Sequence, residues 1–259
     1  MRKSLRIDFY VVVGVILCSI PAILRLQVKP LTSALFLFVF PTIYLFFRKK
    51  KPLKRILIGS ALIGVGIGFV FDVILSANNA WNELPSQLVF NYRIFGFWPA
   101  DEPVWFFLWA LFIIVFYEHF YEREGSGRVS RHFKYIAIPV FLVFVYVFTA
   151  LAVHSKSFHL PYAYFMLAFP AIIPIAYVLR YYPKLSLKFF KTGIFFFCLF
   201  LIYELTAIKL GQWYFPSKQY IGWVEIIGLK FPIEELFFWM MLSTFAVLSI
   251  YEGFVDDGE

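Results

Sequence analysis

The chain consists of long runs of apolar residues that are separated by short polar segments. A run of about 20 apolar residues is the length that an α-helix needs to cross the hydrocarbon core of a membrane. We expect eight such helices, at about residues 7–24, 31–47, 56–77, 102–121, 135–154, 161–179, 189–208 and 232–254. The pattern predicts an all-α fold, a polytopic transmembrane bundle of about eight helices that forms a single membrane domain over residues 1–259.

The composition supports a membrane protein and argues against a soluble one. Hydrophobic residues make up 61% of the chain and charged residues only 15%, which is far from the balance of a soluble domain. A net charge of +8 would suggest a nucleic-acid partner in a soluble chain. Here the basic residues cluster in short loops, where they meet anionic lipid. We therefore expect membrane lipid as a partner and no nucleic acid.

The basic residues also predict how the helices are oriented. Most of the 24 Lys and Arg residues fall on one side of the bundle if both termini lie on that side. Positively charged loops face the cytoplasm, so we expect a multi-pass protein, in a prokaryotic cell membrane, with both termini cytoplasmic. The two long connections, about 78–101 and 209–231, then lie outside. The basic start lacks a cleavage site of small residues, which predicts a first helix rather than a signal peptide.

The two long connections share a pattern of acids, tryptophans and prolines. Asp72 precedes Trp81 by nine residues, and Glu204 precedes Trp213 by nine. Each connection then ends in a proline and two adjacent acids, Pro99-Ala100-Asp101-Glu102 in the first and Pro232-Ile233-Glu234-Glu235 in the second. Two further matches keep the same order, Phe40-Pro41-Thr42-Ile43 with Phe169-Pro170-Ala171-Ile172 and Tyr117-Glu118-His119-Phe120 with Tyr251-Glu252-Gly253-Phe254.

These matches predict an internal duplication with a period of about 130 residues. A period of that length is too long for a solenoid and indicates a duplicated bundle, with halves at about 1–130 and 131–259. Each half holds an even number of helices, so the halves are expected to be two parallel tandem repeats related by an axis along the membrane normal. Both acidic pairs should then face the same side of the membrane.

Six carboxylates are the candidate catalytic residues: Asp72, Asp101, Glu102, Glu204, Glu234 and Glu235. Ionisable groups at the edge of hydrocarbon are costly, so they mark functional sites by default. Carboxyl groups crowded together at low dielectric cannot all ionise, and some would hold protons that they can donate to a weakly basic substrate. The simpler alternative is that each pair, directly after a proline, caps the N-terminus of its helix.

Aromatic residues surround the acids. Those within or beside the two acidic segments are Trp81, Trp98, Trp105, Trp213, Trp223, Trp239 and Phe238. The faces of aromatic rings stabilise cations, which a carbocation formed away from water would need. The alternative is that these tryptophans form the interfacial belt found in most membrane proteins.

The doubled order of acid, tryptophan and Pro-x-acid-acid followed by aromatic residues resembles the membrane lycopene cyclase domain family. That family occurs as two separate subunits or as one fused chain, and the resemblance covers about 40–125 and 165–254. It implies that the chain closes rings at the acyclic ends of lycopene, or of a related acyclic carotenoid, to give β-ionone rings. The chemistry is protonation, attack of an alkene on the cation and loss of a proton, with no redox change, no metal and no cofactor. The protein would work alone or as a homo-oligomer.

The resemblance also implies roles for the residues. Glu234 and Glu235 would be the primary acid and cation-stabilising pair, and Trp213 and Trp81 would line the cation site. Glu204 and Asp72 would relay or remove protons. Asp101 and Glu102 form the matching but altered set, because the first copy reads Pro99-Ala100-Asp101-Glu102-Pro103 where the family usually has Pro-[Leu/Ile]-Glu-Glu.

Other functions remain open. A carotenoid hydratase or a cyclase of longer carotenoids would use the same acid chemistry on the same alkene ends. A non-enzymatic protein, either a proton-coupled transporter or a lipid-binding protein, would also combine repeats with intramembrane acids. A prenyltransferase is disfavoured because the chain lacks paired aspartate-rich motifs for Mg²⁺. A retinal protein is disfavoured because no expected helix has a lysine in its interior.

The remaining motifs predict structural roles. Cys18 and Cys198 lie inside apolar runs and are expected to form neither a disulfide nor a metal site. Gly59, Gly64, Gly66 and Gly68 indicate close helix packing. The four histidines, His119, His132, His154 and His159, have no second ligand at metal spacing and are expected at helix ends or in loops. The tail from Asp256 to Glu259 is expected to be a solvated end.

Overall fold

The computed structural model describes residues 3–48, 52–94, 96, 98–122, 128–153 and 159–256. Within these residues eight helices are long and apolar enough to cross a membrane: Lys3–Leu26, Pro30–Arg48, Leu53–Ala77, Glu102–Phe120, Phe133–Leu151, Ala163–Tyr181, Pro183–Leu210 and Glu235–Val255. The predicted all-α, multi-pass membrane fold is confirmed. The helix ends lie within a few residues of the predicted ones, because the thickness of hydrocarbon limits how short a span can be.

Several spans combine two or three helical segments. The elements are α1 (Lys3–Leu26), α2 (Pro30–Ala34), η1 (Leu35–Val39), α3 (Phe40–Arg48), α4 (Leu53–Ser60), η2 (Ala61–Ile67), α5 (Gly68–Ala77), η3 (Pro85–Gln87), α6 (Glu102–Phe120), α7 (Phe133–Val153), α8 (Ala163–Tyr181), η4 (Pro183–Leu185), α9 (Ser186–Leu210), η5 (Glu235–Leu242), α10 (Ser243–Ile250) and η6 (Tyr251–Val255). The segments η1, η2, η5 and η6 are π-helical. Such wider turns are frequently found at functional sites, and η5 begins with one of the candidate acids, Glu235.

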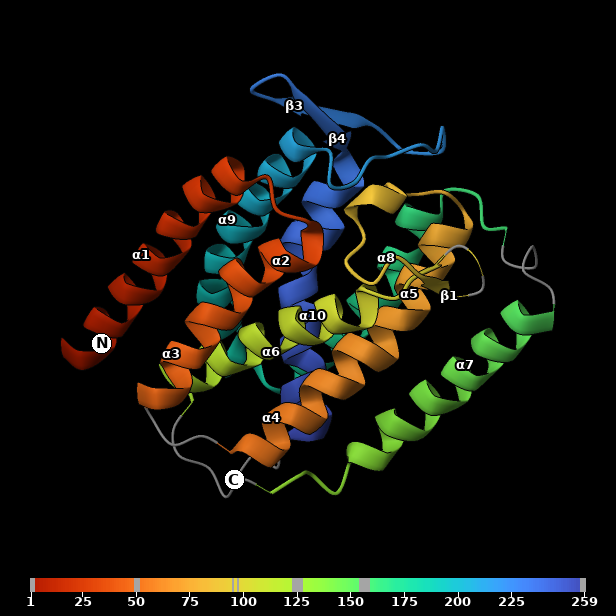
Figure 1. Cartoon of the computed structure of the whole chain (residues 1–259). Coiled ribbons are helices and arrows are strands. Elements are labelled where there is room, and N and C mark those ends of the chain that lie inside the picture. Colours follow the sequence, from red (N-terminus) through yellow and green to blue (C-terminus); the bar gives the residue numbers. More distant parts are fainter. Residues whose placement is uncertain are drawn as a thin grey trace.

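Two small antiparallel hairpins occupy the long connections. In the first, β1 (Arg93–Ile94) pairs with β2 (Trp98–Pro99), and in the second β3 (Trp223–Ile226) pairs with β4 (Leu229–Pro232). One residue separates the end of each hairpin from an acidic pair. The N- and C-termini both lie at one end of the bundle, and β3 and β4 lie at the opposite end (Figure 1). We call these the terminal end and the hairpin end.

Burial separates a central helix from peripheral ones. In α6, 72% of the apolar stretch is buried inside the protein, whereas in α7 only 11% of the apolar stretch is buried. Figure 1 shows α1 and α7, the first helix of each predicted half, on opposite flanks of the bundle. α7 therefore turns most of its surface to the surroundings, which for a membrane span are lipid.

Close packing against α6 depends on glycine, as the sequence predicts. A Cβ atom added to Gly64 would lie 2.5 Å from the backbone carbonyl oxygen of Phe106. Real side chains do not approach that closely, so η2 and α6 could not meet here with any larger residue. This contact fixes the first half of the bundle around Phe106 and its neighbours, which include the candidate acid Glu102.

Among the described residues, two ionic networks with buried carboxylates hold the terminal end. Arg55 is 1% exposed and donates to Glu118 (2.6 Å), to the hydroxyl of Tyr251 (3.0 Å) and to Asp256. The prediction of a solvated tail was therefore wrong for Asp256, which is buried against this guanidinium. Residues 257–259 lie outside the described part of the chain, as does His154.

The second network joins α1, α3 and α6. Asp8 accepts from Tyr44 (2.8 Å) and Arg48 (2.6 Å), and His119 Nε2 lies 3.0 Å from its other oxygen. His119 is only 3% exposed, so its position at a helix end was predicted correctly but its burial was not. Apolar periodicity cannot reveal a partner 111 positions away in the sequence.

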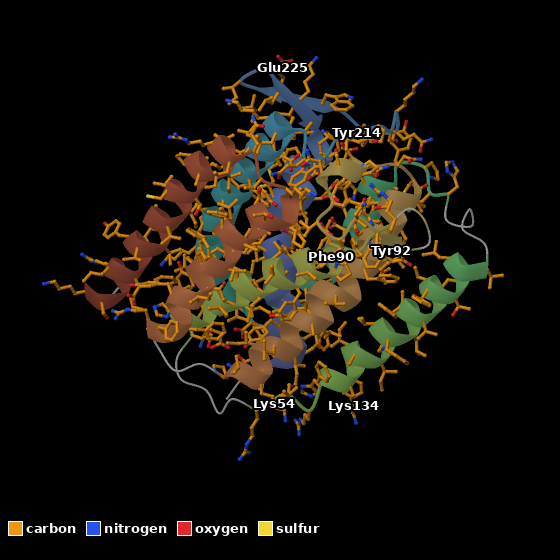
Figure 2. The ribbon with its side chains drawn as sticks, in the orientation of Figure 1. Lys54, Phe90, Tyr92, Lys134, Tyr214 and Glu225 are labelled. Carbon is orange, nitrogen blue, oxygen red and sulfur yellow. The ribbon has the colours of Figure 1, made fainter. Side chains whose placement is uncertain are left out.

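We predict that Arg55→Gln destabilises the fold by about 3–5 kcal/mol, because it leaves the buried carboxylates of Glu118 and Asp256 without the guanidinium that bridges them. The measurement is the midpoint of thermal unfolding in detergent. Lys54→Gln is the matched control, since Lys54 is exposed on the same helix and lies at the terminal end in Figure 2. Equal and small shifts for both variants would contradict a stabilising role for the buried network.

Candidate active site

A cavity of about 640 Å³ lies among the helices of both halves. This volume is typical of a site for a small organic ligand. Among the described residues, five carboxylates line it: Asp72, Glu83, Glu102, Glu204 and Glu235. Each is at most 4% exposed. Residues that are more than 160 positions apart in the sequence are thus brought to one apolar chamber.

The first half contributes an acid and two aromatic rings from one face of α6. Glu102 is the first residue of α6, and Trp105 and Phe106 follow it by three and four positions. This spacing places all three on the same side of the helix, and all three line the cavity. Asp72, on α5, accepts a hydrogen bond from the indole N–H of Trp98. Trp98 itself does not line the cavity among the described residues.

The second half repeats this arrangement. Glu235 is the first residue of η5, and Phe238 and Trp239 follow it by three and four positions and line the cavity with it. Glu204, on α9, accepts from the indole N–H of Trp213 at 3.0 Å. Glu235 accepts from the hydroxyl of Tyr164, on α8. Each candidate acid of this half that reaches the cavity is therefore held by one specific donor.

The two matched tryptophans meet between the halves. The rings of Trp81 and Trp213 lie edge to face with centroids 6.3 Å apart, a favourable arrangement for aromatic rings. The residues that follow them, Asn82 and Tyr214, exchange two backbone hydrogen bonds of 3.0 and 2.9 Å. A reciprocal bond between matched positions is what a two-fold relation between the predicted repeats would produce. The two connections are thereby clamped together over the cavity.

The two acids of each pair lie in different surroundings. Asp101 accepts from the backbone N–H groups of Val89 (2.7 Å) and Phe90 (3.0 Å). Glu234 accepts from the backbone N–H of Ile221 (2.6 Å). Neither acid is among the described residues that line the cavity. Asp101 and Glu234 tie the connections down at the hairpin end, while Glu102 and Glu235 face the chamber.

Aromatic rings form much of the chamber wall. Trp239 stacks on Trp109 with centroids 5.0 Å apart, and Trp105 lies 5.4 Å from Trp239. The indole N–H of Trp105 is bonded to the hydroxyl of Tyr203 (2.9 Å), which in turn donates to the carbonyl of Pro30 (3.1 Å). The polar atoms of Trp105 and Tyr203 are therefore engaged with each other and with the backbone. The rings of Trp105, Trp109 and Trp239 line the chamber. The faces of aromatic rings attract positive charge.

Glu83 is a site residue that the sequence analysis did not identify. It lines the cavity at 3% exposure, and its Oε2 atom has no hydrogen-bond partner among the described residues. Glu83 lies two residues after Trp81, and the equivalent residue after Trp213 is Phe215. The matched pattern of the two halves therefore does not include Glu83. The available signal was that Glu83 is the only acid between the first matched tryptophan and Asp101.

Glu83 lies in the connection outside the membrane-spanning helices, and its environment favours the neutral acid. Burial, together with the charges of Asp72 and Asp101 and against a lowering effect of Arg93, raises the pKa of Glu83 to about 8. Near neutral pH this carboxyl group therefore carries a proton. It adds a protonated acid to the chamber from the first half.

Two other carboxylate oxygens of cavity residues lack a hydrogen-bond partner within the described part of the chain, as Oε2 of Glu83 does. Oδ1 of Asp72 and Oε2 of Glu102 are buried, and neither has a hydrogen-bond partner among the described residues. A buried polar atom without a partner costs about 1–3 kcal/mol. Such atoms are retained where a substrate or proton transfer uses them. The chamber can thus present acid groups to an apolar ligand.

One carboxylate cluster lies away from this chamber. Within the described residues Glu122, Glu252 and Asp256 place their oxygens within 4.8 Å of one another. Lys188 binds Glu122 at 2.5 Å, and Arg55 binds Asp256. Cationic side chains already compensate these acids at the terminal end, so we assign the cluster to the ionic network there.

Comparisons with family models, curated proteins and solved structures find no match to this chain. The resemblance to the membrane lycopene cyclase domains therefore stays a prediction from the doubled motif, and functional reasoning depends on the chamber.

We predict that Glu83→Gln changes how stability depends on pH. In the folded wild type Glu83 stays protonated up to about pH 8, whereas in the unfolded chain it ionises near its ordinary pKa of 4.5. The folded state then binds more protons, so wild-type stability falls as pH rises between these values, by at most about 1.4 kcal/mol per pH unit. Glu83→Gln should remove this pH dependence, so the variant should become more stable relative to the wild type as pH rises.

The measurement is the thermal unfolding midpoint at several values of pH from 5 to 8. Glu225→Gln is the control, because Glu225 is exposed on the β3–β4 hairpin, and its curve should run parallel to that of the wild type. A parallel curve for Glu83→Gln as well would show that Glu83 does not hold its proton.

Proposed function

We propose that this protein is a carotenoid cyclase of the lycopene β-cyclase type, which closes rings at the ends of an acyclic carotenoid by acid catalysis. The observation that supports this most directly is the convergence of five buried carboxylate residues, from both halves, on one apolar chamber walled by tryptophans. Acid groups without water, beside aromatic faces, suit the protonation of an alkene.

The reaction begins with a proton transfer. A neutral carboxyl group, for which Glu235 and its match Glu102 are the primary candidates, gives its proton to the terminal double bond of the substrate. The electron pair of that bond forms the new C–H bond and leaves a tertiary cation. The ring faces of Trp239, Trp105 and Trp109 stabilise this cation electrostatically.

Ring closure and loss of a proton complete the reaction. A second double bond of the same chain attacks the cation and forms the C–C bond of the ring. The cation that results loses a proton from carbon to a carboxylate, with Glu204, Asp72 and Glu83 as candidate acceptors. One proton enters and one leaves, so the product is an isomer of the substrate and neither is oxidised.

The chamber wall also favours ring closure over the addition of water. Apart from the acids, nearly all of the cavity is lined by apolar side chains, such as Ile67, Val140 and Leu167. Water that could capture the cation is scarce in such surroundings, and closing a site against water prevents this side reaction. The arrangement therefore favours a cyclase over a hydratase.

The orientation in the membrane forms part of the proposal. Lys54 and Lys134 lie at the terminal end, opposite Glu225 on the hairpin (Figure 2). Basic residues at the terminal end agree with a cytoplasmic position of both termini in a prokaryotic cell membrane. The acids would then lie toward the outer leaflet.

We predict that Glu235→Gln lowers ring closure by on the order of 100-fold or more, the usual contribution of a general acid. The measurement is the pigment profile of cells that make lycopene and co-express the variant, normalised to the amount of protein in the membrane. Glu225→Gln, an exposed glutamate of the same half, should leave the profile unchanged. Undiminished cyclisation by Glu235→Gln would refute its role as the acid.

The wild-type profile separates the alternatives. Products with β-ionone rings support the cyclase, and hydroxylated products of greater mass indicate a hydratase. Lycopene left unchanged by well-expressed wild-type protein would favour a transporter, a lipid-binding protein or a different substrate.

A further inference from the structure

We propose that a long, acyclic isoprenoid hydrocarbon enters the cavity sideways from the bilayer, between α7 and α8, and lies along α8 with one end at the carboxylates. The identity of the ligand rests on the proposed function. The direction of entry rests on the shape of the cavity, on its closed ends and on the exposure of its lining.

The cavity extends along most of α8. Its lining residues on that helix run from Tyr164, which is bonded to Glu235, to Tyr177. The 13 helical rises between these two residues span about 20 Å. The charged lining residues are at the hairpin end, and the remainder of the path is lined mainly by apolar residues such as Val140, Ala171 and Pro174. The shape suits a linear ligand that is uncharged along its length and reacts at one end.

Both ends of the cavity are covered. At the hairpin end Asn82 and Tyr214 clamp the two connections together, and the hydroxyl of Tyr220 donates to the carbonyl of Ala80 at 2.6 Å. Burial raises the pKa of Tyr220, so this donor keeps its proton. At the other end the rings of Tyr177 and Phe254 stack with centroids 6.3 Å apart. A long ligand therefore needs an entrance on the side.

The side between α7 and α8 provides that entrance. The main contacts of α7 are with η2, α5 and η6, and those of α8 are with α10, η4, α5 and η5. Val143 on α7 and Ile173 on α8 line the cavity while they are 46% and 68% exposed. Because both helices span the membrane, the exposed side faces lipid.

Prolines weaken the two helices at this entrance. Pro139 lies within α7, and Pro170 and Pro174 lie within α8, and all three line the cavity. Each proline removes a backbone hydrogen bond from its helix and allows the helix to bend. The two walls of the entrance can thus bend apart to admit a chain.

The tail of a phospholipid can enter from the side, but only a free hydrocarbon can occupy the whole length of the cavity. A phospholipid headgroup must stay at the membrane surface, and the hairpin end above the acids is covered by the clamped connections. An isoprenoid hydrocarbon has no headgroup, so its whole length can leave the bilayer at the depth of the entrance and turn one end toward Glu102 and Glu235.

Tryptophan fluorescence tests the entrance without any catalysis. Five of the seven tryptophans line the cavity, and Trp223→Phe removes the one that is exposed on the hairpin. In vesicles of phosphatidylcholine brominated in its acyl chains, this background should lose a large part of its emission, because bromine quenches the indole rings that it contacts and five of the six remaining rings line the cavity. Squalene, a colourless isoprenoid hydrocarbon, should reverse the loss by displacing the lipid chain.

Blocking variants locate the entrance. Ala171→Phe, which narrows the cavity from α8, should reduce both the quenching and the effect of squalene. Ile172→Phe is the matched control, because Ile172 is the neighbouring residue, is 40% exposed and does not line the cavity. On α7, Val143→Phe and Leu142→Phe form the equivalent pair.

Each outcome decides one part of the proposal. Two results together support lateral entry of an isoprenoid. Squalene reverses the quenching, and Ala171→Phe reduces the quenching whereas Ile172→Phe does not. Quenching that squalene leaves unchanged would assign the cavity to lipid acyl chains, and an absence of quenching would overturn lateral entry. Lateral entry without ring closure in cells would overturn the proposed function alone, whereas ring closure without quenching would overturn this inference alone.

Discussion

The structure depends on keeping carboxyl groups inside a membrane protein without water. An ionised carboxylate in such surroundings costs several kcal/mol unless it is paired, and even a neutral one needs a hydrogen-bond partner. Trp98, Trp213 and Tyr164 each supply one donor, to Asp72, Glu204 and Glu235. The fold therefore has to place one aromatic donor beside each of these acids, and the two connections bring Trp98 and Trp213 into place.

Neither predicted half can make this chamber alone. The first half contributes Glu102, Asp72 and Glu83, and the second contributes Glu204 and Glu235. The halves meet where the rings of Trp81 and Trp213 touch and where the following residues exchange backbone hydrogen bonds. Asp101 and Glu234 hold the connections in position over the chamber. One acid of each pair thus maintains the structure that lets the other face the chamber, which accounts for the two adjacent acids at the end of each long connection.

The sequence predicts the spans well because hydrocarbon thickness imposes a length and an apolar pattern that can be counted. It also predicts that Glu102, Glu235, Trp105 and Trp239 belong together, because matched spacing and helical periodicity are local properties. It does not separate Asp101 from Glu102 or Glu234 from Glu235, since adjacent residues differ only in the direction that the folded helix gives them. Glu83 and Tyr164 are reached through loop geometry and helix packing, which leave no periodic trace. The burial of Asp256 depends on Arg55, 201 positions away.

The central claim is that the chamber protonates one end of a polyene and then removes a proton from it. The most direct measurement is mass spectrometry of the products after the purified protein, in lipid vesicles, converts lycopene in D₂O. Carboxyl groups that exchange with solvent would donate deuterons, so each ring formed should carry one deuterium in a product that is otherwise an isomer of lycopene. Rings without deuterium, or products that have gained the elements of water, would contradict this account of the chamber.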